Sequence, residues 1–191
     1  MELSKFIELI QVQRHDFLNH LQVISGLTQL NKIDRVREYI SRISMEIAEM
    51  SQTARVKIPE VTAVLLAGFN DASMSQVELK LSVNSSLSGC AVPGPVAGAA
   101  LERALTCAIE AVAPPGTGKN RLEVLLSESD KKYTCRLLLP EHPTGDTGSL
   151  EERLAPIGEL LCPHGGRINL ALANNGLEIF LIFPRKEGKS G

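Results

Sequence analysis

Two histidines lie five residues apart near the start of the chain, in the stretch RHDFLNHLQVISGLTQL of residues 14–30. Asn19 follows His15 by four residues, so on a helix the two side chains share one face and the amide can contact the imidazole or an incoming anion. Arg14 adds positive charge nearby, and Asp16 is a candidate to orient the imidazole. Imidazole is neutral and nucleophilic near pH 7, with an unperturbed pKa of about 6.5. These residue types suit a nucleophile that takes up a phosphoryl group.

The helical period separates the roles of the two histidines. At about 100° per residue, the apolar residues of this segment form an arc centred at roughly 240°. Its members are Phe6, Ile10, Phe17, Leu21, Ile24 and Leu27. His20 falls at roughly 200°, inside the arc, whereas His15 falls at roughly 60°, on the exposed side. We therefore expect His20 to be a hydrogen-bonded histidine on the buried side of a helical bundle. Because the two rings point about 140° apart, a zinc site shared by them is not favoured.

His15 itself has two interpretations. An exposed histidine on a helix is usually only solvated, and periodicity does not distinguish that role from a nucleophile. Of its neighbours Asp16 has the weakest case, because side chains at positions i and i+1 of a helix do not face each other. The candidate site comprises His15 as nucleophile, Asn19 and Arg14 as orienting or charge-stabilising residues, and Asp16 as a candidate imidazole orienter.

The elements that must position these residues are two helices. Residues 4–30 carry apolar side chains at helical spacing, and residues 31–33 interrupt the pattern. Asp34 can cap a second helix, whose apolar residues follow a three-four rhythm as far as Ala54. A two-helix hairpin cannot bury both apolar seams alone, and dimerisation into a four-helix bundle is the usual solution. We predict an antiparallel helical hairpin over residues 1–57 that forms an obligate homodimer.

The remaining sequence predicts a second domain over residues 58–185. Pro59 ends the hairpin, because a proline disfavours helical conformation in the preceding residue. Helices then alternate with strands, which predicts an α+β layer with helices on one face of a mostly antiparallel sheet. We expect helices over residues 59–72 and 95–112 and before residue 167, and strands over residues 77–83, 121–127, 133–139, 167–173 and 176–183. Asn174-Asn175 predicts a hairpin turn, and residues 186–191 are expected to form a flexible tail.

Composition excludes several classes of protein. The 191 residues are 43% hydrophobic and 22% charged, enough to bury a core. The formal net charge is −2 and no basic block is present, so no nucleic acid is expected as a partner. No run approaches the about 20 apolar residues of a membrane span, and four cysteines without C-x-x-C spacing predict reduced thiols and a cytoplasmic protein with no membrane contact. APPGTGKN at residues 113–120 lacks the first glycine and final serine or threonine of a P-loop, so we expect an ordinary loop.

RHDFLNHLQVISGLTQL followed by DRVREYI resembles the phosphoacceptor hairpin of the sporulation initiation phosphotransferase B family, and of the citrate/malate-type sensor histidine kinases that share its helical domain. The resemblance rests on Arg14, His15, Asp16, the aromatic Phe17 and Asn19. It implies that His15 is the phosphorylated histidine, in agreement with the helical period. It assigns no role to His20.

The second half of the chain resembles the GHKL-type ATPase domain of histidine kinases, through HGGRI at residues 164–168 and LERALTCAIEA at residues 101–111. In such kinases two asparagines four residues apart reach Mg²⁺ and the phosphates, whereas Arg103 and Cys107 stand at the matching places here. Glu110 survives, and we expect it to be a solvated or capping charge.

Two further nucleotide motifs of these kinases are altered. PEHPTGDTG at residues 140–148 lacks the aspartate that begins the D-x-G-x-G motif for adenine. The glycine-rich lid is reduced to the region around SLEERLAPIGELL, which leaves few backbone N–H groups for a triphosphate. The resemblance therefore implies an α/β sandwich that retains the ATPase fold without kinase activity.

Together these resemblances imply a phosphorelay phosphotransferase. It would move a phosphoryl group from the aspartate of a single-domain response regulator, through phosphohistidine at His15, to the aspartate of a second regulator that is a transcription factor, in sporulation initiation. No cofactor or metal is expected on this chain, and Mg²⁺ is expected in the acidic pocket of the regulator. Two alternatives stay open: a sensor-type histidine kinase that uses ATP, and a non-catalytic module that docks response regulators.

Overall fold

The computed structural model describes residues 3–112, 120–140, 147–173 and 176–186. The chain divides into two compact units, Met1–Ser51 and Gln52–Gly191, and each is described by itself. No helix in the described ranges is long and apolar enough to cross a membrane. The hairpin turn predicted at residues 174–175 lies outside the described residues. So does the predicted tail except for Lys186, whose N–H donates to the Gly89 carbonyl over 2.7 Å.

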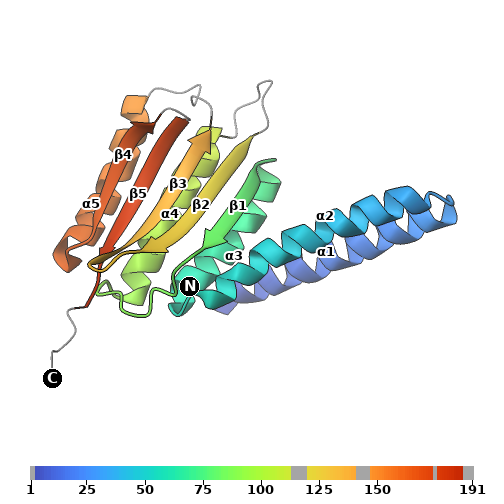
Figure 1. The fold of residues 1–191 in the computed structure, drawn as a ribbon, viewed down its shortest axis with the longest axis horizontal. Helices are drawn as coiled ribbons and strands as arrows, with labels where there is room; N and C mark the ends of the chain where they lie inside the picture. The colour runs from blue at the N-terminus through green and yellow to red at the C-terminus, as the bar shows by residue number, and fades with distance from the viewer. Residues whose placement is uncertain (1–2, 113–119, 141–146, 174–175, 187–191) are drawn as a thin grey trace. The chain divides into compact units, whose positions relative to one another are not determined.

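The first unit is an antiparallel pair of helices, α1 (Leu3–Gln29) and α2 (Ile33–Ser51), which contact each other (Figure 1). Asn31, in the turn between them, has a φ of 53°. This left-handed conformation ends many helices, and asparagine tolerates it better than most residues. The Lys32 N–H then donates to the Leu27 carbonyl over 3.0 Å, which satisfies one of the last carbonyls of α1. The predicted helical hairpin is confirmed.

The second helix departs from the prediction at both ends. The Val36 N–H donates to the Lys32 carbonyl over 3.1 Å, so α2 begins earlier than expected. Asp34 therefore lies within the first turn, where its carboxylate complements the helix dipole, and it is not the cap. α2 also ends before Ala54, because the next residues form the tighter 3₁₀ turn η1 (Gln52–Arg55).

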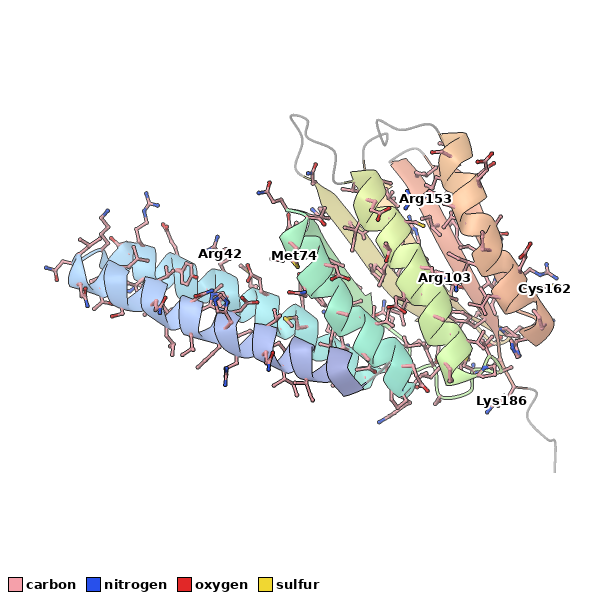
Figure 2. All side chains as sticks on the ribbon, turned by 180° about the vertical axis from the view of Figure 1, so that it is seen from behind. Arg42, Met74, Arg103, Arg153, Cys162 and Lys186 are labelled. Atoms are coloured by element: carbon pink, nitrogen blue, oxygen red, sulfur yellow. The ribbon has the colours of Figure 1, made fainter. Side chains whose placement is uncertain are left out.

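The second unit is a two-layer α/β sandwich. After η1 its elements are α3 (Pro59–Met74), β1 (Glu78–Val83), α4 (Gly94–Val112), β2 (Arg121–Glu128), β3 (Lys132–Pro140), α5 (Thr147–Leu161), the short η2 (Cys162–His164), β4 (Arg167–Ala173) and β5 (Gly176–Pro184). The strand order is β1-β2-β3-β5-β4, with β1 parallel to β2 and the other neighbours antiparallel. The helices α3, α4 and α5 cover one face of the sheet (Figures 1 and 2). The predicted α+β class, with a mostly antiparallel sheet, is confirmed.

The core lies between the sheet and these helices. One side-chain row crosses four strands through Leu81, Val124, Leu137 and Ile179, which are register partners and at most 2% exposed. Alternation along each strand points every second residue toward the helices, as the burial pattern of β2 shows. From the helical layer, side chains such as Ile157 are fully buried in the same core.

A close approach of α4 to α3 depends on small residues. The buried positions of α4 include Ala97, Gly98, Ala100, Ala104 and Ala108. A Cβ at Gly98 would lie 2.9 Å from the Cβ of Glu60 and 3.4 Å from its backbone carbonyl atoms. Because these atoms belong to the first turn of α3 and cannot rotate away, glycine is required at residue 98.

Hydrogen bonds from η1 to the edge of strand β1 explain where the second unit begins. The Gln52 amide donates to the Leu81 carbonyl over 3.0 Å and accepts from the Val83 N–H over 3.1 Å. The Arg55 guanidinium donates to the Val83 carbonyl over 3.3 Å. Because these side chains bind the exposed edge of the sheet, η1 belongs to the second unit, whereas the sequence prediction placed the boundary after residue 57.

Gly98→Ala is expected to lower the free energy of unfolding by about 1–3 kcal/mol, the usual cost of overpacking. The matched control is Gly68→Ala, where the new Cβ would lie 3.2 Å from Leu105 Cδ1 and 4.0 Å from Leu79 Cδ1, both at the ends of side chains. A small shift of the Leu105 methyl group relieves this contact, and alanine gains about 1 kcal/mol over glycine in a helix, so this variant should be more stable than Gly98→Ala. Urea denaturation followed by circular dichroism compares the two, and equal stabilities would contradict the close contact between α3 and α4.

Candidate functional site

His15 extends from α1 into solvent, and its side chain is 74% exposed. Asn19 lies one helical turn further along, with its amide nitrogen 3.1 Å from His15 Nδ1. This is the contact that the i, i+4 spacing predicts. Asn19 therefore restrains the imidazole of His15, which is not surrounded by a hydrophobic core.

Asp16 comes closer to His15 than the helical spacing suggested. Its carboxylate oxygen Oδ1 lies 3.6 Å from His15 Nδ1, and its side chain is 57% exposed. The expectation that neighbouring side chains face apart therefore does not exclude an electrostatic contact, because both side chains are free to turn in solvent. Asn19 and Asp16 thus approach the same ring nitrogen.

Arg14 does not contact the His15 ring as Asn19 and Asp16 do. Successive residues of a helix differ by about 100° in direction, and Arg14 makes no hydrogen bond or ion pair within the described part of the chain. Of the four side chains singled out from the sequence, His15, Asn19 and Asp16 lie together. Arg14 is their neighbour along the chain only.

His20 turns toward α2, as its place in the apolar arc predicts. Its Nδ1 lies 2.9 Å from the Tyr39 hydroxyl, and the side chain is half-buried. The Arg42 guanidinium carbon in turn lies 4.9 Å from the centre of the Tyr39 ring. Sequence analysis missed both α2 residues, although an aromatic residue and an arginine three positions apart on a helix are a recognisable signal for such a contact.

The contacts at His15 leave one ring nitrogen available. Both recorded contacts involve Nδ1, and none in the described ranges involves Nε2. The Asn19 amide nitrogen can only donate, so its contact belongs to the tautomer in which Nδ1 is unprotonated. When Nδ1 carries the proton, it can donate to the Asp16 carboxylate. The lone pair then resides on Nε2, at the outer edge of the ring, where it is the nucleophilic atom.

In the second unit, the two positions of α4 that matched the kinase asparagines differ in exposure. Arg103 is exposed, whereas Cys107 is 7% exposed. Burial raises the pKa of the Cys107 thiol, and the nearby Arg153 guanidinium opposes this shift. Neither side chain offers the amide oxygen that a Mg²⁺ ligand at these positions would supply.

An ion pair links α4 to α5 close to these residues. The Arg153 guanidinium of α5 binds the Glu110 carboxylate of α4, and Figure 2 shows Arg103 and Arg153 on these two helices. Glu110 is exposed, as predicted for a solvated charge, and it also has an ion-pair partner that the sequence did not indicate. Most of the altered adenine motif, at residues 141–146, lies outside the described residues, and so does the P-loop-like stretch at residues 113–119. The region SLEERLAPIGELL, predicted to be the reduced lid, forms most of α5.

The cysteines offer little competing nucleophilic chemistry. Cys90, Cys107 and Cys135 are buried, and Cys162 is exposed. Burial raises the pKa of the Cys135 thiol to about 12, so this side chain is protonated at neutral pH. Burial also raises the pKa of Cys90. Since the thiolate is the reactive form, the three buried cysteines are poor nucleophiles.

The sequence of the first unit matches a known helical domain. Residues 1–56 match the family described as SpoOB-type sensor kinases, alpha-helical domain. A stretch of 88 residues is 31% identical to the sensor protein CitS of Halalkalibacterium halodurans, a match that covers 44% of this chain and 16% of CitS. The chain thus spans only a small part of the length of that relative.

Solved structures with the same fold are histidine kinases. The catalytic domain of ThkA has a TM-score of 0.54 and 13% identity, over 68% of this chain and 94% of ThkA. The Acinetobacter baumannii kinase AdeS has a TM-score of 0.53 and 12% identity, over 91% of this chain and 98% of AdeS. The ATP-binding domain of PrrB from Mycobacterium tuberculosis has a TM-score of 0.50 and 15% identity, over 66% and 95%. The chain therefore has a histidine-kinase ATPase-like fold after a helical domain.

We expect Ellman's reagent at pH 8 to modify Cys162 rapidly in the folded protein. The buried cysteines should react only after unfolding in urea, because desolvation disfavours their thiolates. Cys162→Ser is expected to remove the fast phase. A second fast-reacting thiol in that variant would contradict the burial of the other three.

Proposed function

We propose that this chain is a phosphorelay phosphotransferase. His15 accepts a phosphoryl group from the aspartyl phosphate of a single-domain response regulator and passes it to the aspartate of a second regulator, a transcription factor. The observation that carries the proposal is the exposed His15, with Nδ1 beside Asn19 and Asp16 and Nε2 open to solvent. The match of residues 1–56 to the SpoOB-type helical domain supports it.

The proposed transfer forms one bond and breaks one bond, and it needs no cofactor on this chain. Nε2 of His15 attacks the phosphorus in line with the oxygen of the aspartyl phosphate, the new N–P bond forms, and the P–O bond breaks to release the aspartate carboxylate. The ring becomes a phosphoimidazolium, and its Nδ1 proton faces the Asp16 carboxylate. Donation to the second regulator is the same step in reverse. Mg²⁺ in the acidic pocket of each regulator neutralises charge on the transferring group.

The replaced residues of the second unit favour a phosphotransferase over a kinase. Arg103 and Cys107 occupy the places of the metal-side amides, and the Arg153–Glu110 ion pair ties α5 to α4 beside them. We therefore propose that the chain has no autokinase activity and binds no nucleotide or metal cofactor. The resemblance to the sporulation phosphotransferase family leads us to propose sporulation initiation as the process and the cytoplasm as the location.

We also propose that a second copy of this chain covers the apolar stripe of the hairpin. The stripe comprises Ile10, Phe17 and Leu21 of α1 and Ile40 and Ile47 of α2, all between 45% and 59% exposed. A two-helix hairpin has no third helix to bury these side chains. The same stripe on a second copy is complementary to it by symmetry, and their contact makes a four-helix bundle.

A sensor-type kinase is the second candidate function, favoured by the likeness to CitS and to solved histidine kinases. A kinase would transfer the γ-phosphoryl group of ATP to His15. A module that only docks regulators would accept no phosphoryl group from either source. Labelling from two donors separates these functions.

The wild-type chain is expected to gain an acid-labile, base-stable label from a ³²P-phosphorylated single-domain response regulator with Mg²⁺ and without ATP. His15→Ala should abolish the label because the nucleophile is removed. His164→Ala, which removes an exposed histidine of the second unit, is the matched control and should be labelled as the wild type is. Label from γ-³²P-ATP alone would favour the kinase, and no label from either donor would favour the docking module.

Leu21→Glu is expected to convert the dimer to a monomer, because it places a charge in the apolar stripe. Gln22→Glu, the adjacent residue on the other side of α1, is the control and should remain dimeric. Light scattering after gel filtration gives the molar mass of each. A Leu21→Glu protein with the mass of the wild-type dimer would exclude this stripe as the interface.

A further inference from the structure

Arg42 is held in place by a chain of contacts that the proposed transfer does not use. His20 Nδ1 lies 2.9 Å from the Tyr39 hydroxyl, and this bond crosses from α1 to α2. The Arg42 guanidinium then stacks on the Tyr39 ring at 4.9 Å. The half-buried histidine thereby fixes a tyrosine, and the tyrosine restrains an exposed arginine near the middle of the hairpin (Figure 2).

Helix geometry places Arg42 beside the His15 site along the hairpin axis. Because α1 and α2 run in opposite directions, three residues onward from Tyr39 correspond to three residues back from His20. The Arg42 backbone therefore lies at the level of residue 17, between His15 and Asn19 and within about one turn of each.

The same geometry places Arg42 on the side of the hairpin that carries the His15 site. At about 100° per residue, Asn19 lies about 100° from the direction of His20, on the flank of α1 opposite the apolar stripe. On α2, Arg42 lies about 60° from the direction of Tyr39, again on the flank opposite the stripe. Two right-handed helices that run antiparallel present these flanks to the same side. The proposed dimer contact therefore leaves Arg42 on the surface that carries the His15 site.

The charge of Arg42 is not neutralised by its neighbours. Glu38 and Glu46 lie four residues before and after it, at the spacing of helical ion pairs, yet neither pairs with it in the described hairpin. Arg37, by contrast, lies 3.8 Å from Asp34. Stacking on Tyr39 restrains Arg42 without using its N–H donors for a carboxylate, so the donors remain available for an anion.

We propose that Arg42 is the cation of α2 that binds the acidic, phosphorylated surface of the donor response regulator, with Tyr39 and His20 as positioning residues. This inference rests on the proposed phosphotransferase function. The carboxylates around the aspartyl phosphate make this surface strongly anionic, and a planar guanidinium bonds carboxylate oxygens in pairs. Restraint before binding lowers the entropy cost of ordering the long side chain. Arg42 thus supplies the positive charge that the sequence assigned to Arg14.

The test measures transfer from a ³²P-labelled single-domain response regulator as a function of regulator concentration. Arg42→Ala is expected to raise KM roughly tenfold, the effect of one hydrogen bond between charged groups, and to leave kcat unchanged because Arg42 does not touch the reacting atoms. Arg42→Lys should recover part of the loss, since the charge remains and the planar donor pair does not. KM of the Arg42→Ala protein should also depend less on salt than that of the wild type.

Variants of Tyr39 test the role of the positioning residues. Tyr39→Leu removes the ring and is expected to raise KM as Arg42→Ala does, and the double variant should be no worse than either single variant. Tyr39→Phe keeps the ring and loses the bond to His20, so a smaller rise in KM is expected. Circular dichroism and molar mass verify that each variant keeps its helices and its dimer.

Arg37→Ala is the matched control, because it removes another exposed arginine of α2. It should transfer as the wild type does. Phosphoramidate, a small phosphoryl donor with no protein surface, should label His15 equally in all variants. An Arg42→Ala protein with the KM of Arg37→Ala would overturn the inference while the wild-type label still supports the proposed function. A wild-type chain labelled by phosphoramidate but not by the regulator would overturn both.

Discussion

The period of the α-helix is the constraint on which the first unit depends. Five residues separate His15 from His20, and this spacing places one ring in solvent and the other against α2. A spacing of four would have put both rings on one face, where they compete for one environment. One helix therefore carries an accessible nucleophile and an interhelical hydrogen bond less than two turns apart.

An accessible nucleophile must be oriented by its own helix, because no core surrounds it. Asn19 meets this need from the next turn and Asp16 from the adjacent position, and both act on Nδ1. Such local contacts leave the outer side of the ring clear. In the proposed relay His15 would meet two different partners in turn, and an open ring with a locally restrained orientation suits that role better than a pocket complementary to one partner.

The sequence predicted the bounds of an element well where its apolar residues recur with one regular spacing. The bounds of β4 match the expected residues 167–173, because alternation and the flanking residues mark both ends. The predicted cap at Asp34 was wrong, since a helix start depends on which carbonyl accepts the first bond. The contacts of Tyr39 with His20 and of Arg153 with Glu110 were also missed. They join residues 19 and 43 positions apart, and side-chain pairing over such distances leaves no periodic signal.

The packing of the second unit is compatible with the proposed loss of its nucleotide site. The fold is held by apolar rows such as Leu81, Val124 and Leu137, which face the helices across the sheet. Arg103 and Glu110 lie on the exposed side of α4 and contribute little to that core. Replacing a metal ligand there costs the fold almost nothing, and an exposed ion pair such as Arg153–Glu110 adds little stability of its own. Selection on such residues therefore acts through the activity of the site, and a chain whose chemistry resides on the hairpin can lose the site and keep the domain.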